Sequence, residues 1–279
     1  TAADFQPAPQ RFFQETAARL EDGIPPGAAR LIELGADGQP RVFAAGQWYR
    51  LEGTQWVAIA GLKCASPGEF VLAHAAGSPL HLSLPWADVR QVLRQGEKIW
   101  VATDADPFLV VDGRAKSLGW PSRLRVNQIA AGPDGTLWVA SSGGLFFQAK
   151  QGWAPRVFAD PVGRQWGATE VTGVAWDGSG QLWIASLAGV ACETRNGWRF
   201  YEGRDGLPWN EFTGVAPGPG NTLWFGTRLG AIRFDGATWA YRQGPRWLPD
   251  DHVRQMVIDA GGNAWMTTAR GVGVLRRTP

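Results

Sequence analysis

The chain has 279 residues, including 37 glycines, 19 prolines and 16 tryptophans, with 19% charged residues and a formal net charge of +2. So many tryptophans and so few charges exclude a disordered chain, and no stretch has the composition of a coiled coil. The sequence has no run of about 18 consecutive apolar residues that would span a bilayer, and no basic stripe. We therefore expect a turn-rich β protein packed by aromatic side chains, with neither nucleic acid nor membrane insertion among its interactions.

A repeated unit runs through most of the chain and consists of a turn, a Leu-Trp pair, small residues and a glycine. Stretches such as GPDGTLWVASSGG (132–144) and PGNTLWFGTRLG (219–230) show it clearly. The tryptophan of this unit, here called the slot tryptophan, recurs at similar intervals in Trp100, Trp138, Trp183, Trp224 and Trp265. Each unit reads as four short strands separated by turn residues, as in VTGVAWDG, QLWIAS, GVACET and WRFYEG (171–203). Four antiparallel strands at a period of roughly 40 residues are typical of a β-propeller blade.

In chain order, the first predicted strand covers residues 10–14. The segment 10–33 matches 198–217: two aromatic residues, then Asp-Gly-Ile/Leu-Pro, then an inner strand. The last unit stops one strand short at Pro279. We therefore predict that residues 10–14 complete the C-terminal blade and close the ring, which would leave no open sheet edge there.

The blades follow this strand. Two weak copies of the unit, around 39–46 and 68–77, place Val42 and Val71 in the tryptophan slot, at spacings clearly shorter than those between the slot tryptophans. Counting both gives an all-β, single-domain propeller of seven blades over residues 1–279; the alternative is six blades with 61–88 as an insertion. The seven predicted blades cover approximately 28–54, 55–86, 87–124, 125–160, 170–204, 211–243 and 252–279.

The slot predicts how neighbouring blades pack. One large side chain per blade would fill the gap to the next blade. The residue two positions later lies on the same strand face and is small in every copy, for example Ala140, Ala185 and Gly226. We expect it to make room for side chains of the neighbouring blade.

The repeat resembles the two-component regulator propeller family. The most similar copy is FYEGRDGLPWN (200–210) followed by NTLWFGTRLG (221–230), and degenerate copies cover essentially the whole chain, poorly over 29–88. The resemblance implies a periplasmic or extracellular sensory propeller, often joined to a membrane-spanning signalling module, with carbohydrate fragments as ligands of many members. The stretches GPDGTLW and GPGNTLWFG also resemble, more weakly, repeats of the streptogramin lyase propellers.

Candidate ligand-binding residues gather on the loops that lead into the inner strands. Five of these loops carry a tryptophan: Trp86, Trp120, Trp166, Trp209 and Trp247. Beside them lie polar groups: Asp88, Arg90, Arg125, Asn127, Glu170, Asn210, Glu211, Asp250, Asp251, His252 and Arg254. Flat aromatic faces flanked by polar groups suit a carbohydrate-like ligand, and arginine suits a carboxylated one. The alternative is that these tryptophans pack the corners of the blades.

The histidines, the cysteines and the Asp-Gly pairs offer few candidates for catalysis or metal binding. His252 is the one candidate general base, since it opens an inner strand, while His74 and His81 read as structural residues of a hairpin. No histidine or cysteine has metal-ligand spacing, and the Asp-Gly pairs read as hairpin turns, so we expect no metal and no cofactor. Cys64 and Cys192 are far apart in apolar runs and read as buried free thiols.

The sequence therefore favours a non-enzymatic propeller, periplasmic or extracellular, that recognises a small or oligosaccharide ligand at the mouth of its channel. A signalling module in a longer parent chain would be its partner. The chain begins at Thr1 without the pattern of a signal peptide, so we expect a mature product or an excised domain. The alternatives are a lyase or hydrolase acting on a polysaccharide or lactone, and a protein-interaction scaffold.

Overall fold

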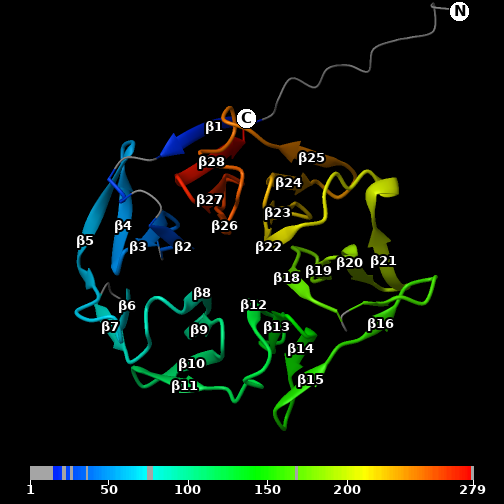
Figure 1. Cartoon of the computed structure of the whole chain (residues 1–279), viewed down its shortest axis with the longest axis horizontal. Coiled ribbons are helices and arrows are strands. Elements are labelled where there is room, and N and C mark those ends of the chain that lie inside the picture. The colour runs from blue at the N-terminus through cyan, green and yellow to red at the C-terminus, as the bar shows by residue number, and fades with distance from the viewer. Residues whose placement is uncertain are drawn as a thin grey trace, which may run out of the picture.

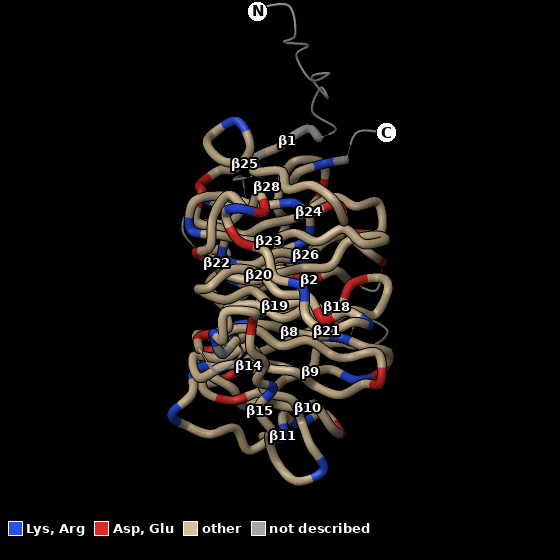
Figure 2. The backbone as a smooth tube through the Cα atoms, turned by 90° about the vertical axis from the view of Figure 1, so that its right-hand side faces the viewer, with Lys and Arg blue, Asp and Glu red and all other residues tan. Residues whose placement is uncertain are grey.

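The computed structural model describes residues 15–20, 23–25, 28–35, 37–73, 78–166 and 169–277. Four-stranded antiparallel sheets stand around a central channel as the blades of a β-propeller, with the first strand of each blade innermost (Figure 1). Seen from the side of the ring, lysines and arginines are interspersed with acidic residues (Figure 2). Within the described residues the one helical turn is η2 (Gly203–Asp205). No helix in that part of the chain is long and apolar enough to cross a membrane.

The described residues form six such blades. Blade 1 contains β2 (Ala29–Leu34), β3 (Pro40–Ala44), β4 (Gln47–Glu52) and β5 (Gln55–Lys63). Blade 2 contains β8 (Val89–Gln95), β9 (Lys98–Thr103), β10 (Pro107–Val111) and β11 (Arg114–Ser117). Blade 3 contains β12 (Val126–Ala131), β13 (Leu137–Ser141), β14 (Gly144–Gln148) and β15 (Trp153–Pro155).

The chain continues around the ring through the other three blades. Blade 4 contains β18 (Val171–Trp176), β19 (Leu182–Ser186), β20 (Gly189–Thr194) and β21 (Gly197–Tyr201). Blade 5 contains β22 (Phe212–Pro217), β23 (Leu223–Thr227), β24 (Gly230–Phe234) and β25 (Trp239–Arg242). Blade 6 contains β26 (Gln255–Ile258), β27 (Ala264–Thr268), β28 (Gly271–Arg277) and, from the start of the chain, β1 (Glu15–Leu20).

The count of seven blades is corrected to six. The segment predicted as the second blade, 55–86, divides into β5, which is the outer strand of blade 1, and a separate hairpin of β6 (Phe70–Ala73) and β7 (Pro79–Leu82). The short stretch of chain around Val71 cannot hold four strands with their turns, so this weak copy forms only two. The indole of Trp48 donates a hydrogen bond to the Val71 carbonyl at 2.6 Å and fastens this hairpin to blade 1.

The slot tryptophans fill the spaces between blades. Trp224 of blade 5 packs in a cluster with Val253, Met256 and Met266 of blade 6, and Trp265 of blade 6 packs against blade 1. The small residue two positions later has the expected role, because a Cβ on Gly226 would lie 2.9 Å from Val253 of the next blade. Trp183 and Trp265 also donate their indole N–H to Asp177 and Asp259 at the end of the preceding inner strand, at 2.8 and 2.9 Å.

The ring closes through strand pairing between the two ends of the chain. Strand β1 lies antiparallel to β28, with Glu15 opposite Arg277 and Leu20 opposite Val272, and forms the outer strand of blade 6 (Figure 1). The predicted closing segment, residues 10–14, lies outside the described residues, and the pairing begins directly after it. Because β1 occupies the outer edge of β28, the first and last parts of the chain hold one sheet together.

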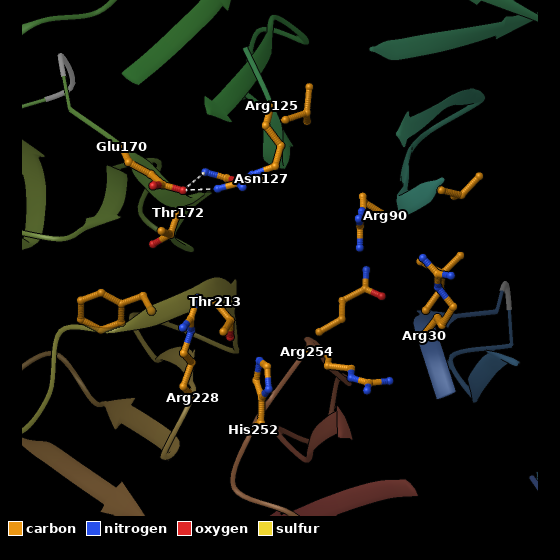
Figure 3. Close-up of a pocket in the computed structure, with 15 residues that line it drawn as sticks. Arg30, Arg90, Arg125, Asn127, Glu170, Thr172, Thr213, Arg228, His252 and Arg254 are labelled. Carbon is orange, nitrogen blue, oxygen red and sulfur yellow. Dashed lines mark hydrogen bonds and ion pairs between the residues drawn. The ribbon is translucent and has the colours of Figure 1, made fainter. Parts of the chain in front are cut away.

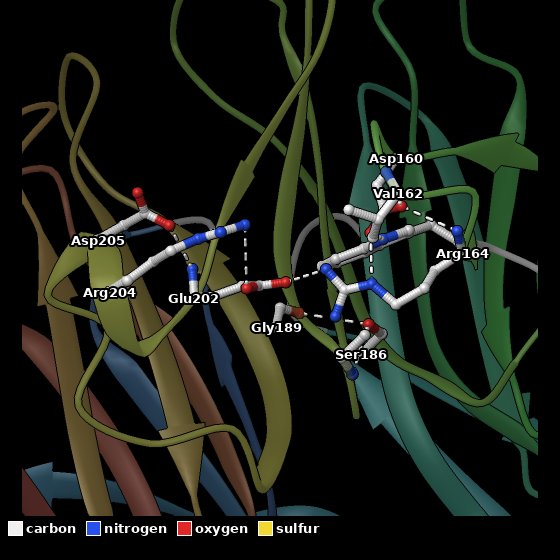
Figure 4. Close-up of polar contacts among 10 residues, drawn as sticks. Asp160, Val162, Arg164, Ser186, Gly189, Glu202, Arg204 and Asp205 are labelled. Atoms are coloured by element: carbon white, nitrogen blue, oxygen red, sulfur yellow. Dashed lines mark hydrogen bonds and ion pairs between the residues drawn. The ribbon is translucent and has the colours of Figure 1, made fainter.

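A second insertion links blades 3 and 4 and leads toward Glu170. Its two strands, β16 (Phe158–Ala159) and β17 (Gln165–Trp166), pack on blade 4, where Phe158 stacks on Trp198 with ring centroids 3.5 Å apart. The buried Asp160 carboxylate accepts hydrogen bonds from the Trp166 indole at 3.1 Å and from the Arg164 guanidinium at 2.5 Å. Arg164 also pairs with Glu202 of blade 4 (Figure 4).

The hydrogen bonds that Asp160 accepts from Trp166 and Arg164 contribute to stability in a pH-dependent way. Burial alone would raise the pKa of Asp160, but hydrogen bonds from the Trp166 indole and from the backbone and side chain of Arg164 lower it to about 2. The pKa of an aspartate in an unfolded chain is about 3.9. The contribution of Asp160 to folding stability is therefore complete above that pH and is lost as the pH falls toward 2. We predict that Asp160→Asn unfolds in less urea than the parent at pH 6, and that the difference shrinks between pH 4 and pH 2. Asp112→Asn, on an exposed turn, is the matched control; a difference for Asp160→Asn that is independent of pH would contradict this assignment.

Candidate functional site

The end of the channel where the inner strands begin is here called the mouth. In five of the six inner strands, one residue near this end is left out of the regular strand pairing. In blade 1, Ala29 pairs with Ala44 and Leu31 with Phe43, so Arg30 between them is a bulge. The same shift occurs at the second residue of β8, β12, β18 and β22. In blade 6 the equivalent residue, Arg254, directly precedes β26. These six positions form the mouth ring: Arg30, Arg90, Asn127, Thr172, Thr213 and Arg254. Bulges change the direction of a side chain, and a repeated bulge does so at equivalent points around the ring.

The mouth ring surrounds a cavity of about 680 Å³, and all six of its residues line it (Figure 3). This volume lies within the range of roughly 300–1,000 Å³ that small-molecule sites occupy. The remaining polar and charged lining consists of Arg125, Glu170, Arg228, His252 and Gln255, and the apolar lining of Leu31, Val89, Val126 and Phe212. Five arginines against one glutamate give the cavity a positive character.

Three consecutive blades, 6, 1 and 2, place the arginines of the mouth ring on one side of the opening (Figure 3). Burial, followed by the positive charges of Arg90 and Arg254, lowers the pKa of Arg30, while Asp88 and Asp104 oppose this effect. Arg90 pairs with Asp104 at 3.2 Å, and Arg254 donates to the Ala29 carbonyl at 3.2 Å. The Arg30 guanidinium is therefore close enough to those of Arg90 and Arg254 to feel their charges, and Arg90 and Arg254 are held in place by local contacts.

The opposite side carries a hydrogen-bonded group. Arg125 and Glu170 form an ion pair at 2.5 Å, and Asn127 accepts from Arg125 at 3.1 Å while donating to the Val171 carbonyl at 2.8 Å. This network joins blade 3 to blade 4 and neutralises the one acidic residue of the cavity. The hydroxyl groups of Thr172 and Thr213 follow on blades 4 and 5.

Arg228 and His252 lie beside Thr213 (Figure 3). Arg228 belongs to the turn between β23 and β24, where the Thr227 hydroxyl donates to the Gly230 carbonyl at 2.8 Å. The backbone N–H of His252 donates to the Asp250 carboxylate at 2.9 Å, and its exposed imidazole lines the cavity. A histidine, His252, and an acidic residue, Glu170, thus face the same cavity.

Three glutamines narrow the channel beneath the cavity. They follow the mouth ring directly in β8, β12 and at the start of β26, and we call Gln91, Gln128 and Gln255 the glutamine floor. Gln91 exchanges two hydrogen bonds with the backbone of Ile129 in the next blade, at 3.0 and 2.8 Å. Gln255 accepts from the Ile32 N–H at 2.8 Å.

Gln128 makes the longest of these bridges. Its carboxamide donates to the Val215 carbonyl at 2.6 Å and accepts from the Val215 N–H at 3.0 Å, so it reaches from blade 3 to blade 5 past blade 4. The blades beside it carry glycine at this position, because a Cβ on Gly173 or Gly214 would lie 3.2 or 3.1 Å from the Gln128 oxygen. A pocket of about 60 Å³ lies at this level and is lined by all three glutamines, so the channel is narrower here than in the cavity above.

A second cavity of about 340 Å³ lies in the channel beyond the floor. Its walls are mainly apolar, including Leu93, Trp176 and Ile258. The buried Glu33 carboxylate pairs with Arg94 at 3.1 Å, and burial raises the pKa of Glu33 while Arg94 opposes this. The charged cavity and the apolar one are therefore separated by the glutamine floor.

The five loop tryptophans lie in the hydrophobic clusters between and beside the blades rather than along the cavity. Trp120, Trp166 and Trp247 are buried, and Trp86 and Trp209 are half-buried against neighbouring clusters. Trp120 donates its indole N–H to the Leu124 carbonyl at 2.7 Å. None of these five residues is among those that line the mouth cavity. Their placement matches the alternative in which they pack the corners of blades.

The polar candidates divide into two groups. The structure brings six of them together around the cavity: Arg90, Arg125, Asn127, Glu170, His252 and Arg254. The others do not line it: Asp88, Asn210, Glu211, Asp250 and Asp251. Of these, Asp88 acts electrostatically on Arg30, and Asp251 accepts from the Gly244 N–H at 2.6 Å.

Four residues that line the cavity are not among the candidates predicted from the sequence: Arg30, Thr172, Thr213 and Arg228. Aligning the inner strands as ARLI, VRQV, VNQI, VTGV, FTGV and VRQM puts the first three in the same position as Arg90, Asn127 and Arg254. An alignment of the six inner strands would therefore have identified all the residues of the mouth ring from the sequence. Arg228 lies in a turn between the second and third strands of blade 5, whereas the predicted candidates lie in loops that lead into the inner strands.

The described residues contain no group of three or more histidine, cysteine, aspartate or glutamate side chains that would hold a metal ion. His81 contacts Glu69 at 2.7 Å within the β6–β7 hairpin, and His74 lies outside the described side chains. Both cysteines are free thiols, and burial, followed by the charge of Asp177, raises the pKa of Cys192 to about 12. Such a thiol is a poor nucleophile, as expected of a packing residue.

Comparison with known proteins shows the fold. No family model matches the sequence, and no curated protein matches it. Among solved structures, virginiamycin B lyase from Staphylococcus aureus is 13% identical with a TM-score of 0.69, over 94% of this chain and 98% of that one. The extracellular domain of the putative hybrid two-component system BT3049 from B. thetaiotaomicron is 17% identical with a TM-score of 0.67, over 95% of this chain and 42% of that one. The chain is thus an all-β propeller similar in fold to the extracellular domain of a putative two-component system and to a lyase.

A substitution of Gln128 tests whether the glutamine floor stabilises the ring. Gln128→Ala removes both hydrogen bonds to Val215 and leaves that backbone pair without its partner. We predict a loss of about 1–3 kcal/mol in the free energy of unfolding, measured by urea denaturation. The control Gln151→Ala, on an exposed loop, should change it by less than about 0.5 kcal/mol. Equal effects of the two variants would show that the bridge does not stabilise the ring.

Proposed function

We propose that this chain is a sensory recognition propeller, acting in the periplasm or outside the cell, that binds a small carbohydrate-like ligand in the cavity at the channel mouth. The observation that carries the proposal is the mouth ring: six blades present six polar side chains to one cavity. Ligand occupancy would be passed to a signalling module joined to the propeller in a longer chain.

Several features support this proposal. The cavity opens on one face of the ring, ends at the glutamine floor and has hydrogen-bonding groups from every blade. Sugars require many donors and acceptors, and the amide, hydroxyl and guanidinium groups of the mouth ring supply them. The similar structure from a two-component system is an extracellular domain, which favours the same kind of role. The loop tryptophans are not part of the proposal, because their rings are occupied by packing.

Occupying the cavity with a large side chain tests the proposal. We predict that a panel of neutral and acidic mono- and oligosaccharides contains compounds that raise the melting temperature of the parent, because a ligand that binds only the folded state stabilises it. Thr172→Trp would place a bulky ring in the cavity among the residues of the mouth ring and abolish the shift, whereas Thr54→Trp, on an exposed turn, would retain it. A panel that leaves the parent unchanged, or a shift that survives Thr172→Trp, would contradict ligand binding at the mouth.

A second function is favoured by one observation, the presence of His252 and Glu170 in the same cavity. These groups could act as base and acid in a lyase or hydrolase reaction on a polysaccharide or lactone. In that case the parent would turn over such a substrate, and His252→Gln would lower kcat by about 10²-fold or more while the melting temperature is kept. Turnover that is indifferent to this change would place the chemistry elsewhere, and a substrate bound without turnover favours the sensor.

A further inference from the structure

We infer that the ligand of the mouth cavity is an anionic sugar, bound with its carboxylate or phosphate against Arg30, Arg90 and Arg254 and its neutral hydroxyl groups toward Asn127, Thr172 and Thr213. This inference rests on the proposed function and specifies the ligand and its orientation. It follows from the order of residues around the mouth ring.

The arginines and the neutral residues of the mouth ring are grouped on separate sides and do not alternate. Blades 6, 1 and 2 contribute arginine and blades 3, 4 and 5 contribute asparagine, threonine and threonine. Every one of these residues occupies the same bulge or the equivalent position before β26, so the ring is divided into a cationic half and a neutral half. A ligand with charge at one end and hydroxyl groups at the other matches this division.

The cationic half is suited to an oxyanion. Half-buried Arg30 feels the charges of both Arg90 and Arg254, which are themselves exposed at the mouth. Asp88 and Asp104 offset this charge, but neither of them lines the cavity. An incoming carboxylate or phosphate would relieve the repulsion among the arginines and accept several charge-assisted hydrogen bonds, which are stronger than neutral ones.

The neutral half is suited to hydroxyl groups. The only acidic side chain that lines the cavity among the described residues, Glu170, is already paired with Arg125 at 2.5 Å. Thr172 donates to the Ala185 carbonyl at 3.3 Å, which leaves its oxygen to accept from a ligand hydroxyl. Threonine and asparagine would hold a sugar ring by hydrogen bonds. Arg228, which comes from a turn outside the mouth ring, adds one positive charge beside Thr213.

The floor determines which part of a ligand fits. Gln91, Gln128 and Gln255 are fixed by hydrogen bonds to the backbones of other inner strands, and they narrow the channel at this level. A monosaccharide or the end of an oligosaccharide that enters along the channel axis would therefore stop at the glutamine floor.

Three probes with related skeletons test the inference: glucose, glucuronic acid and glucose 6-phosphate, titrated by calorimetry into the parent protein. We expect binding of one or both acids at low salt, at least about tenfold tighter than glucose, and weaker binding as ionic strength rises. The preference between the two acids distinguishes a carboxylate ligand from a phosphate ligand. Arg30→Gln and Arg90→Gln should each weaken acid binding by about tenfold or more, while Arg114→Gln, on outer strand β11, should leave it unchanged.

The outcomes separate this inference from the proposed function. Glucose binding as tight as that of the acids, with no effect of Arg30→Gln, would overturn the anionic ligand while keeping carbohydrate binding at the mouth. Acid binding that is weakened equally by Arg114→Gln would also overturn it, because it would reflect general charge attraction. Failure of all three probes and of every larger acidic or neutral glycan would contradict both proposals. Melting curves of each variant show whether the fold is retained.

Discussion

Each blade of this protein can bury its two apolar faces only against the blades on either side. A single four-stranded sheet is too small to stand alone, so the ring is stable only when it is closed. The slot tryptophans supply the contact between consecutive blades, and the small residue two positions later gives the next blade room to approach. Strand β1 completes blade 6 on its outer edge, so the beginning of the chain holds the end in place. The positions of all the inner strands follow from this closure.

Closure also produces the site. When six inner strands are held around one axis, equivalent residues of each strand come to the same height. Five bulged residues and Arg254, directly before β26, then form one ring of side chains. The next residue of each strand forms the level below, where glutamines cross the channel and glycines leave them space. The site is therefore built from residues far apart in the sequence, Arg30 and Arg254 among them, whose charges interact because the ring is closed.

The architecture could be predicted from the sequence because every blade packs on its neighbours in the same way. The same large and small side chains therefore recur once per blade. The slot tryptophans and their spacing predicted four-stranded blades and the role of Gly226 correctly. The count failed at Val71, where a valine in the slot suggested a blade, although the short spacing to Val42 and Trp100 leaves length for only a hairpin. That spacing was the better guide, and it supported the six-blade alternative.

The site was harder to predict, because local sequence does not show which side chains point into a channel. A tryptophan beside polar residues in a loop looks the same whether it stacks on a ligand or packs a blade corner, and Trp120 and Trp166 are buried. Arg90, Asn127 and Arg254 were found among the loop candidates, but their equivalence with Arg30, Thr172 and Thr213 depends on the register of the inner strands.

The claim that the mouth ring is the ligand site is tested most directly by NMR, with glucuronic acid added to protein labelled at the backbone and arginine nitrogens. The account predicts that the largest shifts occur at the guanidinium groups of Arg30, Arg90 and Arg254 and at the backbone amides of Thr172 and Thr213. The outer strands β11 and β25 should remain unchanged. Shifts concentrated on those outer strands, or on the loops that carry Trp86 and Trp209, would contradict the account.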